Sequence, residues 1–360
     1  MNRREFMTAL GGAAAVAATR PVAAAEVPAF ARGAVELEPI LKDAEVVRAH
    51  KTGKGASFFI DDAIWFLRDI ARRRPKSLFD SDFLGPLKDA HDRFGLKLQI
   101  NLFYRTDFFY GMDEFTLAEV PDVYKAEWQA NKDWLRLGFH SLQEFPDYPW
   151  INIDYGDVKK LFGMIRDEVD RFAGDGVFTT SLVPHWCPMS KDGCRALKDC
   201  GIKIMECSVG PRYRYDGNRS RLPYGHGLKL EQNRKPETAF YWRDSRNAAI
   251  MSSICSYNHI STEQWRQTVN SYRFLLDRDT GMRFKNLFGD APVLNLVDVP
   301  TLKRDTQAIL GRDYLVFSNH EQYFYRDYLA YQPDYAEKVR VMSKMMHDNG
   351  YRFMFIEDIA

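Results

Sequence analysis

Five acidic and basic side chains stand where short apolar runs of the sequence end. Each lies within two residues of the end of such a run, and together they are Asp61, Asp62, His140, His185 and His320. Carboxylates and imidazoles are the ligands that zinc and other first-row divalent ions take in proteins, and they are also the usual general acids and bases. If the fold brings these positions together, their chemistry is metal binding combined with proton transfer.

The adjacent pair Asp61 and Asp62 has two interpretations. Aspartates before a helix often cap its first turn, which is worth about 0.5–2 kcal/mol. One cap suffices, however, and a second carboxylate beside Phe58, Phe59 and Trp65 is costly unless a positive charge offsets it. We therefore favour a divalent cation over a purely structural role.

His140 and Glu144 are spaced i, i+4, which places both on one face if the chain forms a helical turn there. With Asp62 they would make a mixed carboxylate and imidazole set for a metal ion, and His185 could replace or join Glu144. The alternative for each histidine is a structural side chain that is satisfied by the backbone.

Apolar runs with strand character alternate with helical periodicity after residue 55, which predicts an α/β fold. The expected strands are 56–60, 96–104, 134–139, 177–183, 202–205, 248–254, 293–296, 314–318 and 351–355. The expected helices are 64–74, 83–94, 121–131, 157–172, 191–199, 262–277 and 334–348. We expect a single (β/α) barrel of about seven strands, with an open doubly wound sheet as the alternative. Such a barrel gathers its functional side chains at the carboxyl ends of the strands. No GxGxxG or P-loop pattern follows any strand.

Four segments resemble the motifs of the polysaccharide deacetylase (NodB-homology) superfamily in order and spacing. They are Phe59-Ile60-Asp61-Asp62-Ala63, His140-Ser141-Leu142-Gln143-Glu144, Pro184-His185-Trp186 and Asn319-His320-Glu321. The resemblance implies a distorted (β/α) barrel with Asp61 as general base, His320 as general acid, and Asp62 and His140 as metal ligands. The second motif here has Glu144 where the family has histidine, and the third keeps the proline but lacks the arginine.

The function that this resemblance implies is metal-dependent removal of acetyl or other acyl groups from a poly- or oligosaccharide. Zinc is the favoured ion, with cobalt, nickel and manganese as alternatives, and the ligands are Asp62, His140, Glu144 and His185. We expect Tyr104, Trp186 and Glu321 to contact substrate. Two other functions stay open: a glycoside hydrolase that uses paired carboxylates without metal, and a non-catalytic saccharide-binding protein.

The amino terminus has the layout of an export signal. Arg3-Arg4 precedes a weakly apolar stretch and the small residues 22–25, which resembles a twin-arginine signal. We expect residues 1–25 to be that signal and 26–360 to be one barrel domain with a loop excursion near 208–240. The protein is then periplasmic or secreted, and the twin-arginine export machinery is a partner.

Charge and composition exclude other classes of partner. The chain has 50 Lys and Arg against 49 Asp and Glu, a net charge of +1, which argues against nucleic-acid binding. No apolar run approaches the roughly 20 residues of a membrane span. The five cysteines lack the CxxC spacing of a zinc knuckle, so we expect buried thiols with at most one disulfide.

Overall fold

The structure, a computed structural model, describes residues 44–106, 114–144, 149–150, 153–186, 189–207, 264, 267–286, 291–326, 328 and 331–360. The expected signal at 1–25, the excursion near 208–240 and the strand at 248–254 lie outside these ranges. In the described part, Cys194 and Cys200 are free thiols. No helix among the described residues is long and apolar enough to cross a membrane.

The described strands form two five-stranded sheets. In the first, β2 is central, and the members are β10 (Arg352–Phe353), β2 (Gly55–Ala63), β3 (Leu98–Phe103), β4 (Leu135–Ser141) and β9 (Tyr314–His320). Every pairing in it is parallel. The second sheet runs in the order β1 (Ala44–Arg48), β7 (Arg273–Asp277), β8 (Arg283–Asn286), β6 (Ile204–Cys207) and β5 (Ser181–Leu182). Its strands β5, β6 and β8 are parallel, while β7 is antiparallel to both neighbours.

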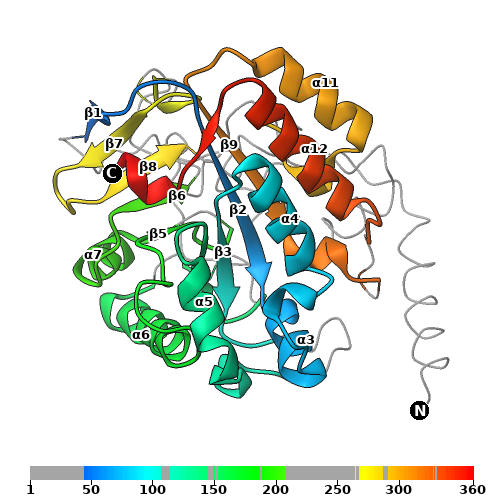
Figure 1. Cartoon of the computed structure of the whole chain (residues 1–360). Coiled ribbons are helices and arrows are strands. Elements are labelled where there is room, and N and C mark those ends of the chain that lie inside the picture. Colours follow the sequence, from blue (N-terminus) through cyan, green and yellow to red (C-terminus); the bar gives the residue numbers. More distant parts are fainter. Residues whose placement is uncertain are drawn as a thin grey trace, which may run out of the picture.

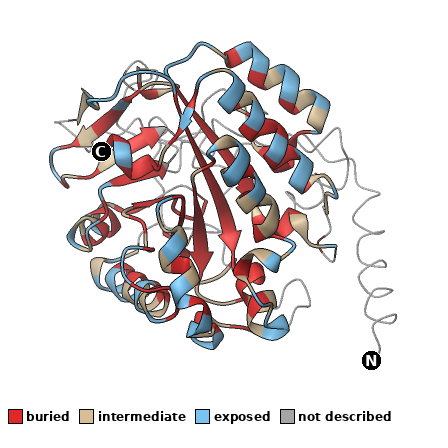
Figure 2. Ribbon diagram, viewed as in Figure 1, coloured by how far each residue is buried: buried red, intermediate tan, exposed pale blue. Residues whose placement is uncertain are grey.

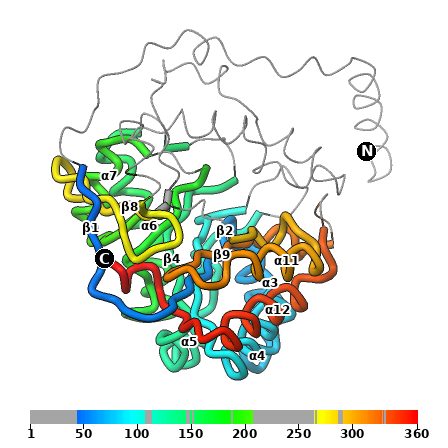
Figure 3. Tube along the Cα trace, turned by 90° about the horizontal axis from the view of Figure 1, so that it is seen from above, coloured from blue at the N-terminus to red at the C-terminus, as the bar shows by residue number. Residues whose placement is uncertain are grey.

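Helices separate most of the parallel strands, as α/β architecture requires. They are α3 (Trp65–Arg73), α4 (Leu84–Phe94), α5 (Lys125–Asn131), α6 (Tyr155–Phe172), α7 (Lys191–Asp199), α11 (Val299–Ile309) and α12 (Tyr335–Asp348). Short 3₁₀ helices span Leu78–Asp80, Leu117–Glu119, Asp122–Tyr124, Leu294–Leu296 (η8), Glu321–Phe324 (η9) and Ile356–Ile359 (η10). In Figure 1, α4, α11 and α12 lie to the right of β2, and α6 and α7 lie to the left of β3; Figure 3 shows the same separation from above.

The two faces of the first sheet differ in polarity because side chains alternate along a strand. One face, which includes Phe58, Ile60, Leu98 and Ile100, joins the helices in the main apolar core. Figure 2 shows these strands buried while the helices expose their outer residues. The other face carries Ser57, Asp61, Gln99, Asn101 and His140, which are no more than 5% exposed. A polar face buried to this degree must find hydrogen-bond partners inside the protein.

A second, smaller apolar cluster lies on that polar face and links the two sheets. It contains Phe59 of β2 and Tyr314 of β9 together with Ile204 of β6 and Phe274 of β7. An isolated parallel bridge between Leu137 and Phe178 also connects β4 with the approach to β5. The sheets therefore share one interior. Among the described residues, however, the ladders leave two open sheets, so closure into a barrel stays a prediction.

The shared interior also buries an acidic and a basic side chain on neighbouring strands. Glu206 of β6 lies opposite Lys285 of β8 in the parallel register, and both are fully buried. The Lys285 ammonium donates to the backbone oxygens of Thr268 and Arg273 at 2.5 and 2.9 Å. Burial lowers the pKa of Lys285 to about 7 and raises the pKa of Glu206 well above its ordinary value.

Most expected elements are present, and two expectations are wrong. The helix expected at 262–277 is wrong in its second half: Gln264, Gln267 and Thr268 are helical, but Arg273–Asp277 is strand β7, which pairs with β1, a strand that the sequence pattern did not predict. The strand expected at 293–296 is the 3₁₀ helix η8, after a single bridge from Val293 to Ser318. Both segments are short apolar runs, for which periodicity does not separate helix from strand.

Helix α3 is capped by a residue that is distant in sequence. Its N-cap residue, Ile64, makes no side-chain cap. The carboxylate of Glu321 instead accepts the backbone N–H groups of Ile64, Trp65 and Phe66 at 2.6, 2.9 and 2.5 Å. Burial raises the pKa of Glu321 to about 7, although these hydrogen bonds favour the charged form. The capping interpretation of Asp61 and Asp62 is therefore wrong, because Glu321 fills that place.

This cap predicts that Glu321→Gln destabilises the fold. The amide supplies one acceptor in place of two and turns an N–H₂ group toward backbone donors, so we expect the free energy of unfolding to fall by about 1–3 kcal/mol. Urea denaturation followed by circular dichroism measures it. Glu337→Gln, at an exposed position of α12, is the matched control and should change stability by less than about 0.5 kcal/mol. Equal stability of the two variants would contradict the cap.

Candidate metal centre

Three predicted ligands converge at the carboxyl ends of the parallel strands. Asp62 lies near the end of β2, His140 near the end of β4, and His185 three residues after β5. Each offers one ligand atom, and these atoms all lie within 4.8 Å of one another. The three residues are only 2–3% exposed. Burial of this kind excludes the ordinary explanation of a solvated cluster of surface charges.

Two β-bulges aim these side chains. Between the pairs Ile60–Ile100 and Ala63–Leu102, strand β2 has one residue more than β3, and the bulge contains Asp61 and Asp62. Strand β4 has an extra residue against β3 at His140. A bulge interrupts the alternation of side chains and redirects them, which is a common device beside active sites.

Backbone strain is present at the same place. Asp62 has φ 58° and Trp186, next to His185, has φ 64°. Residues other than glycine adopt this left-handed region at an energetic cost of roughly 1–3 kcal/mol, so the surrounding structure must impose it. In a regular strand, two consecutive side chains point to opposite faces. The left-handed backbone of Asp62 in the bulge allows both aspartates to point into the same interior.

Backbone carbonyls determine which nitrogen of each histidine carries the proton. His140 Nδ1 lies 2.6 Å from the Val183 oxygen, and His185 Nε2 lies 2.9 Å from the backbone oxygen of Glu144. A carbonyl oxygen accepts only, so these two nitrogens donate. In a neutral ring the remaining nitrogen then has a lone pair. Hydrogen bonds of this type orient histidine ligands in metal sites.

The two lone pairs and one carboxylate oxygen point at a common position. His140 Nε2 lies 3.0 Å from Asp62 Oδ1, His185 Nδ1 lies 3.1 Å from the same oxygen, and the two nitrogens are 3.1 Å apart. Three acceptors so close repel one another unless a proton or a cation lies among them. A set of two imidazoles and one carboxylate fits zinc and related ions and leaves further coordination positions for water or substrate.

The pKa values describe the site without metal. Burial alone would raise the pKa of Asp62, but its close contacts with the His140 and His185 rings hold it well below its ordinary value. Burial works against a charged His140, yet the carboxylates of Asp61 and Asp62 outweigh it and raise the pKa of that ring. Both shifts favour a proton between His140 and Asp62 in the absence of metal.

Glu144 stands outside this group, so its expected role as a ligand stays a prediction that the three-residue group does not include. Its Oε2 accepts a hydrogen bond from Gln322 Nε2 at 2.8 Å, and the same nitrogen donates to Asp62 Oδ2 at 2.7 Å. Residues 142–144 form a bend in place of the helical turn that the i, i+4 spacing suggested. Glu144 is thus a neighbour of the ligands, and Gln322 links its carboxylate to that of Asp62.

His320 and Asp61 flank the three ligands. They lie opposite each other in the register of β9 and β2. The Nδ1 of His320 lies 3.0 Å from Asn295 Oδ1, and its Nε2 lies 4.0 Å from Asp62 Oδ2. Asp61 Oδ1 accepts from Asn101 Nδ2 at 2.7 Å and lies 3.9 Å from His140 Nδ1. The His320 side chain is 15% exposed, more than any of the three ligands, so solvent reaches the site from its side.

The residues expected to contact substrate differ in position. Trp186 is 6% exposed, and its ring lies 6.1 Å from that of His185. Tyr104 is half-buried directly after β3 and packs against the main core. Glu321 is fully buried and engaged with α3, so we interpret it as a cap in place of a substrate contact.

Phe103, which the sequence did not single out, packs at 5.4 and 5.1 Å from the rings of His140 and His185.

The neutral amides around the site were not predicted from the sequence. Asn101, Asn295 and Gln322 each contact a predicted site residue. Amide side chains are common and do not ionise, so residue type alone does not identify them as site residues. Only the position of Gln322, two residues after His320, could have suggested a role.

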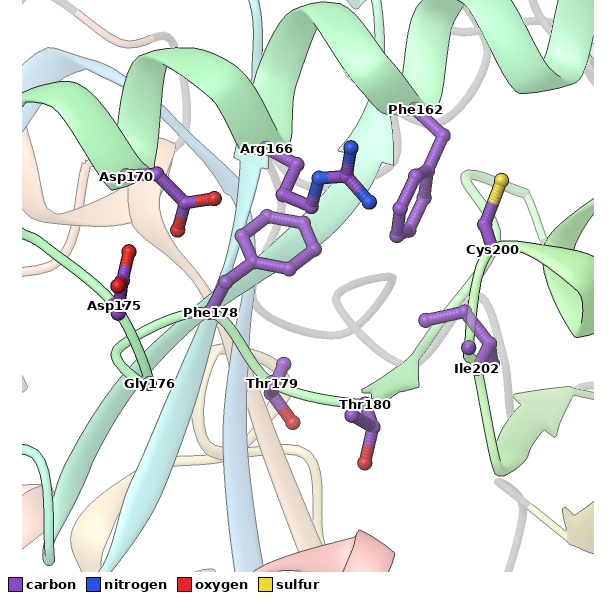
Figure 4. A pocket seen from close by; sticks show the side chains of 11 residues that line it. Phe162, Arg166, Asp170, Asp175, Gly176, Phe178, Thr179, Thr180, Cys200 and Ile202 are labelled. Carbon is purple, nitrogen blue, oxygen red and sulfur yellow. The ribbon is translucent and has the colours of Figure 1, made fainter.

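A separate cavity lies at the opposite ends of the strands. Its volume is about 300 Å³, and it is lined by residues of α6, the segment before β5 and the segment before β6. In Figure 4 Asp170 and Asp175 lie next to each other at one edge of it. Burial, helped by Asp175, raises the pKa of Asp170. Because α/β enzymes act at the carboxyl ends of their strands, we do not assign the chemistry to this cavity.

Comparisons with known proteins leave the family open. No protein-family model and no curated protein matches the chain. Among solved structures, a 4-α-glucanotransferase from Thermococcus litoralis is similar with a TM-score of 0.45 and 10% identity, covering 85% of this chain. The chain spans 40% of that enzyme's length. A Mycobacterium smegmatis protein described as a polysaccharide deacetylase has a TM-score of 0.39 and 13% identity, covering 91% of this chain and 93% of its own. Both TM-scores are too low to support an argument about activity.

The geometry predicts one divalent ion for each chain. We expect zinc analysis of protein purified without chelator to give about one equivalent, and Asp62→Ala, His140→Ala and His185→Ala each to lose most of it. His347→Ala, at an exposed position of α12, is the control and should keep the ion. Full zinc content in His185→Ala would contradict this ligand set.

Metal affinity should depend on pH. Below the raised pKa of His140, the metal-free site holds a proton that the ion must displace. Affinity therefore falls as the pH falls through that pKa, by up to about tenfold per pH unit for each proton released. Zinc titrations by calorimetry at pH 6, 7 and 8, in buffers of different ionisation enthalpy, count those protons. A dissociation constant that is unchanged across this range would show that no proton shares the site.

Proposed function

We propose that the chain is a metal-dependent hydrolase that removes acyl groups, acetyl in the first instance, from a carbohydrate. The observation that supports this most is the meeting of three buried acceptors with a carboxylate, Asp61, and a histidine, His320, on neighbouring strands beside them. The sequence motifs that resemble the polysaccharide deacetylases supply these same residues. Saccharide as substrate comes from that resemblance.

Asp62, His140 and His185 would hold the ion. When bound, a divalent ion of this kind polarises an acyl carbonyl and lowers the pKa of a water molecule toward neutrality. The protein contributes a fixed set of donors, because two backbone carbonyls hold the rings and Gln322 holds the second oxygen of Asp62. Zinc fits this set, with cobalt, nickel or manganese as alternatives.

Asp61 is the proposed general base. Its carboxylate lies beside the ligands without being one of them, and Asn101 holds its Oδ1 in place. A base must be oriented toward the proton that it takes, and general base catalysis contributes roughly 100- to 10,000-fold. Asp61 would accept the proton of the attacking water on the β3 side of the site.

His320 is the proposed general acid. Its Nδ1 donates to Asn295 Oδ1, which leaves Nε2 as the nitrogen that faces the site. A proton on Nε2 would pass to the leaving oxygen or nitrogen of the sugar. The greater exposure of His320 suits a group that must meet substrate and exchange its proton with solvent.

Two further proposals concern the whole chain. We propose that residues 1–25 direct twin-arginine export to the periplasm or outside the cell, as the paired arginines suggest. We also propose that the two sheets belong to one distorted (β/α) barrel, which the shared polar interior supports. Twin-arginine export carries folded proteins, so the ion would be loaded before export.

Acetate release tests the proposed function. We expect the zinc-loaded protein to release acetate from acetylated oligosaccharides, and Asp61→Asn and His320→Ala to lose about 100- to 10,000-fold in kcat while keeping the metal. His347→Ala should remain fully active.

The alternatives make different predictions for the same assay. Cleavage of the glycosidic bond that survives removal of metal would indicate a glycoside hydrolase. Saccharide binding with neither reaction would indicate a binding protein. Acetate release that persists in Asp61→Asn would refute the assignment of the base.

A further inference from the structure

A chain of hydrogen bonds crosses the interior from β5 to Asp61. The Ser181 hydroxyl donates to Gln99 Oε1 over 2.5 Å, and Gln99 Nε2 donates to Asn101 Oδ1 over 3.0 Å. Asn101 Nδ2 then donates to Asp61 Oδ1 over 2.7 Å. Ser181 and Asn101 are fully buried and Gln99 is 1% exposed, so water does not replace these bonds.

The direction of every bond follows from the carboxylate at the end. An ionised Asp61 accepts only, so Asn101 must present its N–H₂ group to it and its oxygen to Gln99. Gln99 must then present its own N–H₂ group to Asn101 and its oxygen to Ser181, which has to donate. All three donors therefore point toward Asp61. Hydrogen bonds that run in one direction polarise and strengthen one another.

A glycine in β4 leaves room for this chain of hydrogen bonds. Strand β4 pairs with β3 on one side, with Asn101 opposite Gly138, and its Leu137 bridges to Phe178 on the other side. A Cβ on Gly138 would lie 2.7 Å from Asn101 Oδ1 and 2.7 Å from the Thr179 methyl group. The space above this residue is thus filled by the side chains that connect the two sheets.

The far end of the chain is anchored. The backbone N–H of Ser181 donates to Thr179 Oγ1 over 3.2 Å, and the Thr179 hydroxyl donates to Glu357 Oε2 of η10 over 3.1 Å. Glu357 in turn forms an ion pair with Arg136. Thr179 and Glu357 thus hold the backbone at Ser181, where the chain of hydrogen bonds begins.

We propose that Gln99 and Ser181 are positioning residues that hold Asp61 through Asn101 in the orientation of the general base. The proposal rests on the proposed function, which makes Asp61 the base. Neither residue touches the ligands of the candidate metal centre, so their effect has to pass along the chain. Without Gln99, the Asn101 amide can rotate and present its oxygen to Asp61, which turns the carboxylate away.

Kinetics of two interrupted chains provide the first test. We expect Ser181→Ala and Gln99→Met to lower kcat for acetate release by about 10- to 100-fold, the size of effect that a misplaced catalytic group produces. The KM and the zinc content should stay within about twofold of wild type, since substrate and metal contacts are untouched. Ser343→Ala, which also removes a fully buried serine hydroxyl but on α12, should keep the wild-type kcat.

The double variant separates positioning from structural damage. When the hydrogen-bond chain is already broken at Gln99, the Ser181 hydroxyl no longer affects the orientation of Asn101. The double variant Gln99→Met, Ser181→Ala should therefore have the kcat of Gln99→Met alone. Two independent packing defects would instead multiply their effects. Multiplying effects, or a kcat of wild-type size in either single variant, would overturn the proposal.

A second measurement does not depend on activity. In protein labelled with ¹⁵N-asparagine, we expect the Asn101 side-chain amide protons to exchange with solvent at least about tenfold faster in Ser181→Ala than in wild type or Ser343→Ala. If the wild-type protein releases no acetate, the proposed function fails. The exchange measurement then still decides whether Ser181 holds the Asn101 side chain in place. Unchanged exchange in Ser181→Ala would refute the chain itself.

Discussion

Three hydrogen-bond acceptors held about 3 Å apart in a buried place are the constraint on which the rest of this structure depends. Asp62, His140 and His185 cannot share their position without a positive charge among them. In the absence of metal, a proton between His140 and Asp62 meets the requirement, as the opposite shifts of their pKa values indicate. A divalent ion meets it better, because it satisfies all three acceptors at once.

The fold maintains this arrangement with several local distortions that would otherwise be unfavourable. Bulges in β2 and β4 and the left-handed backbone of Asp62 turn the ligands inward. Glu321 then caps α3, so that neither aspartate of β2 is drawn to the helix that follows it. The face of the sheet opposite the helices is polar from Ser181 to Asp61. The hydrogen bonds on this face orient Asp61 independently of Asp62.

Much of the architecture could be predicted from the sequence because local pattern controls it. The strand at Gly55–Ala63 and the helices at Leu84–Phe94 and Tyr155–Phe172 agree with their expected ranges within a few residues. Prediction failed at Arg273–Asp277, whose partner β1 lies more than 220 residues earlier. A short apolar run takes the structure that its partner dictates, and the partner is invisible to a local pattern.

The sequence by itself determined the chemistry that is available: two consecutive aspartates and three histidines, each close behind an expected strand. Only the tertiary structure decided which of them share a ligand position, because that choice depends on bulges and on carbonyl groups from other strands. It brought His185 together with Asp62 and His140 as candidate ligands and left Glu144 outside that group, since residues 142–144 bend where a helical turn was expected. It also revealed the amides of Gln99, Asn101 and Gln322, whose roles come from the direction of hydrogen bonds that span the fold and cannot be inferred from residue type.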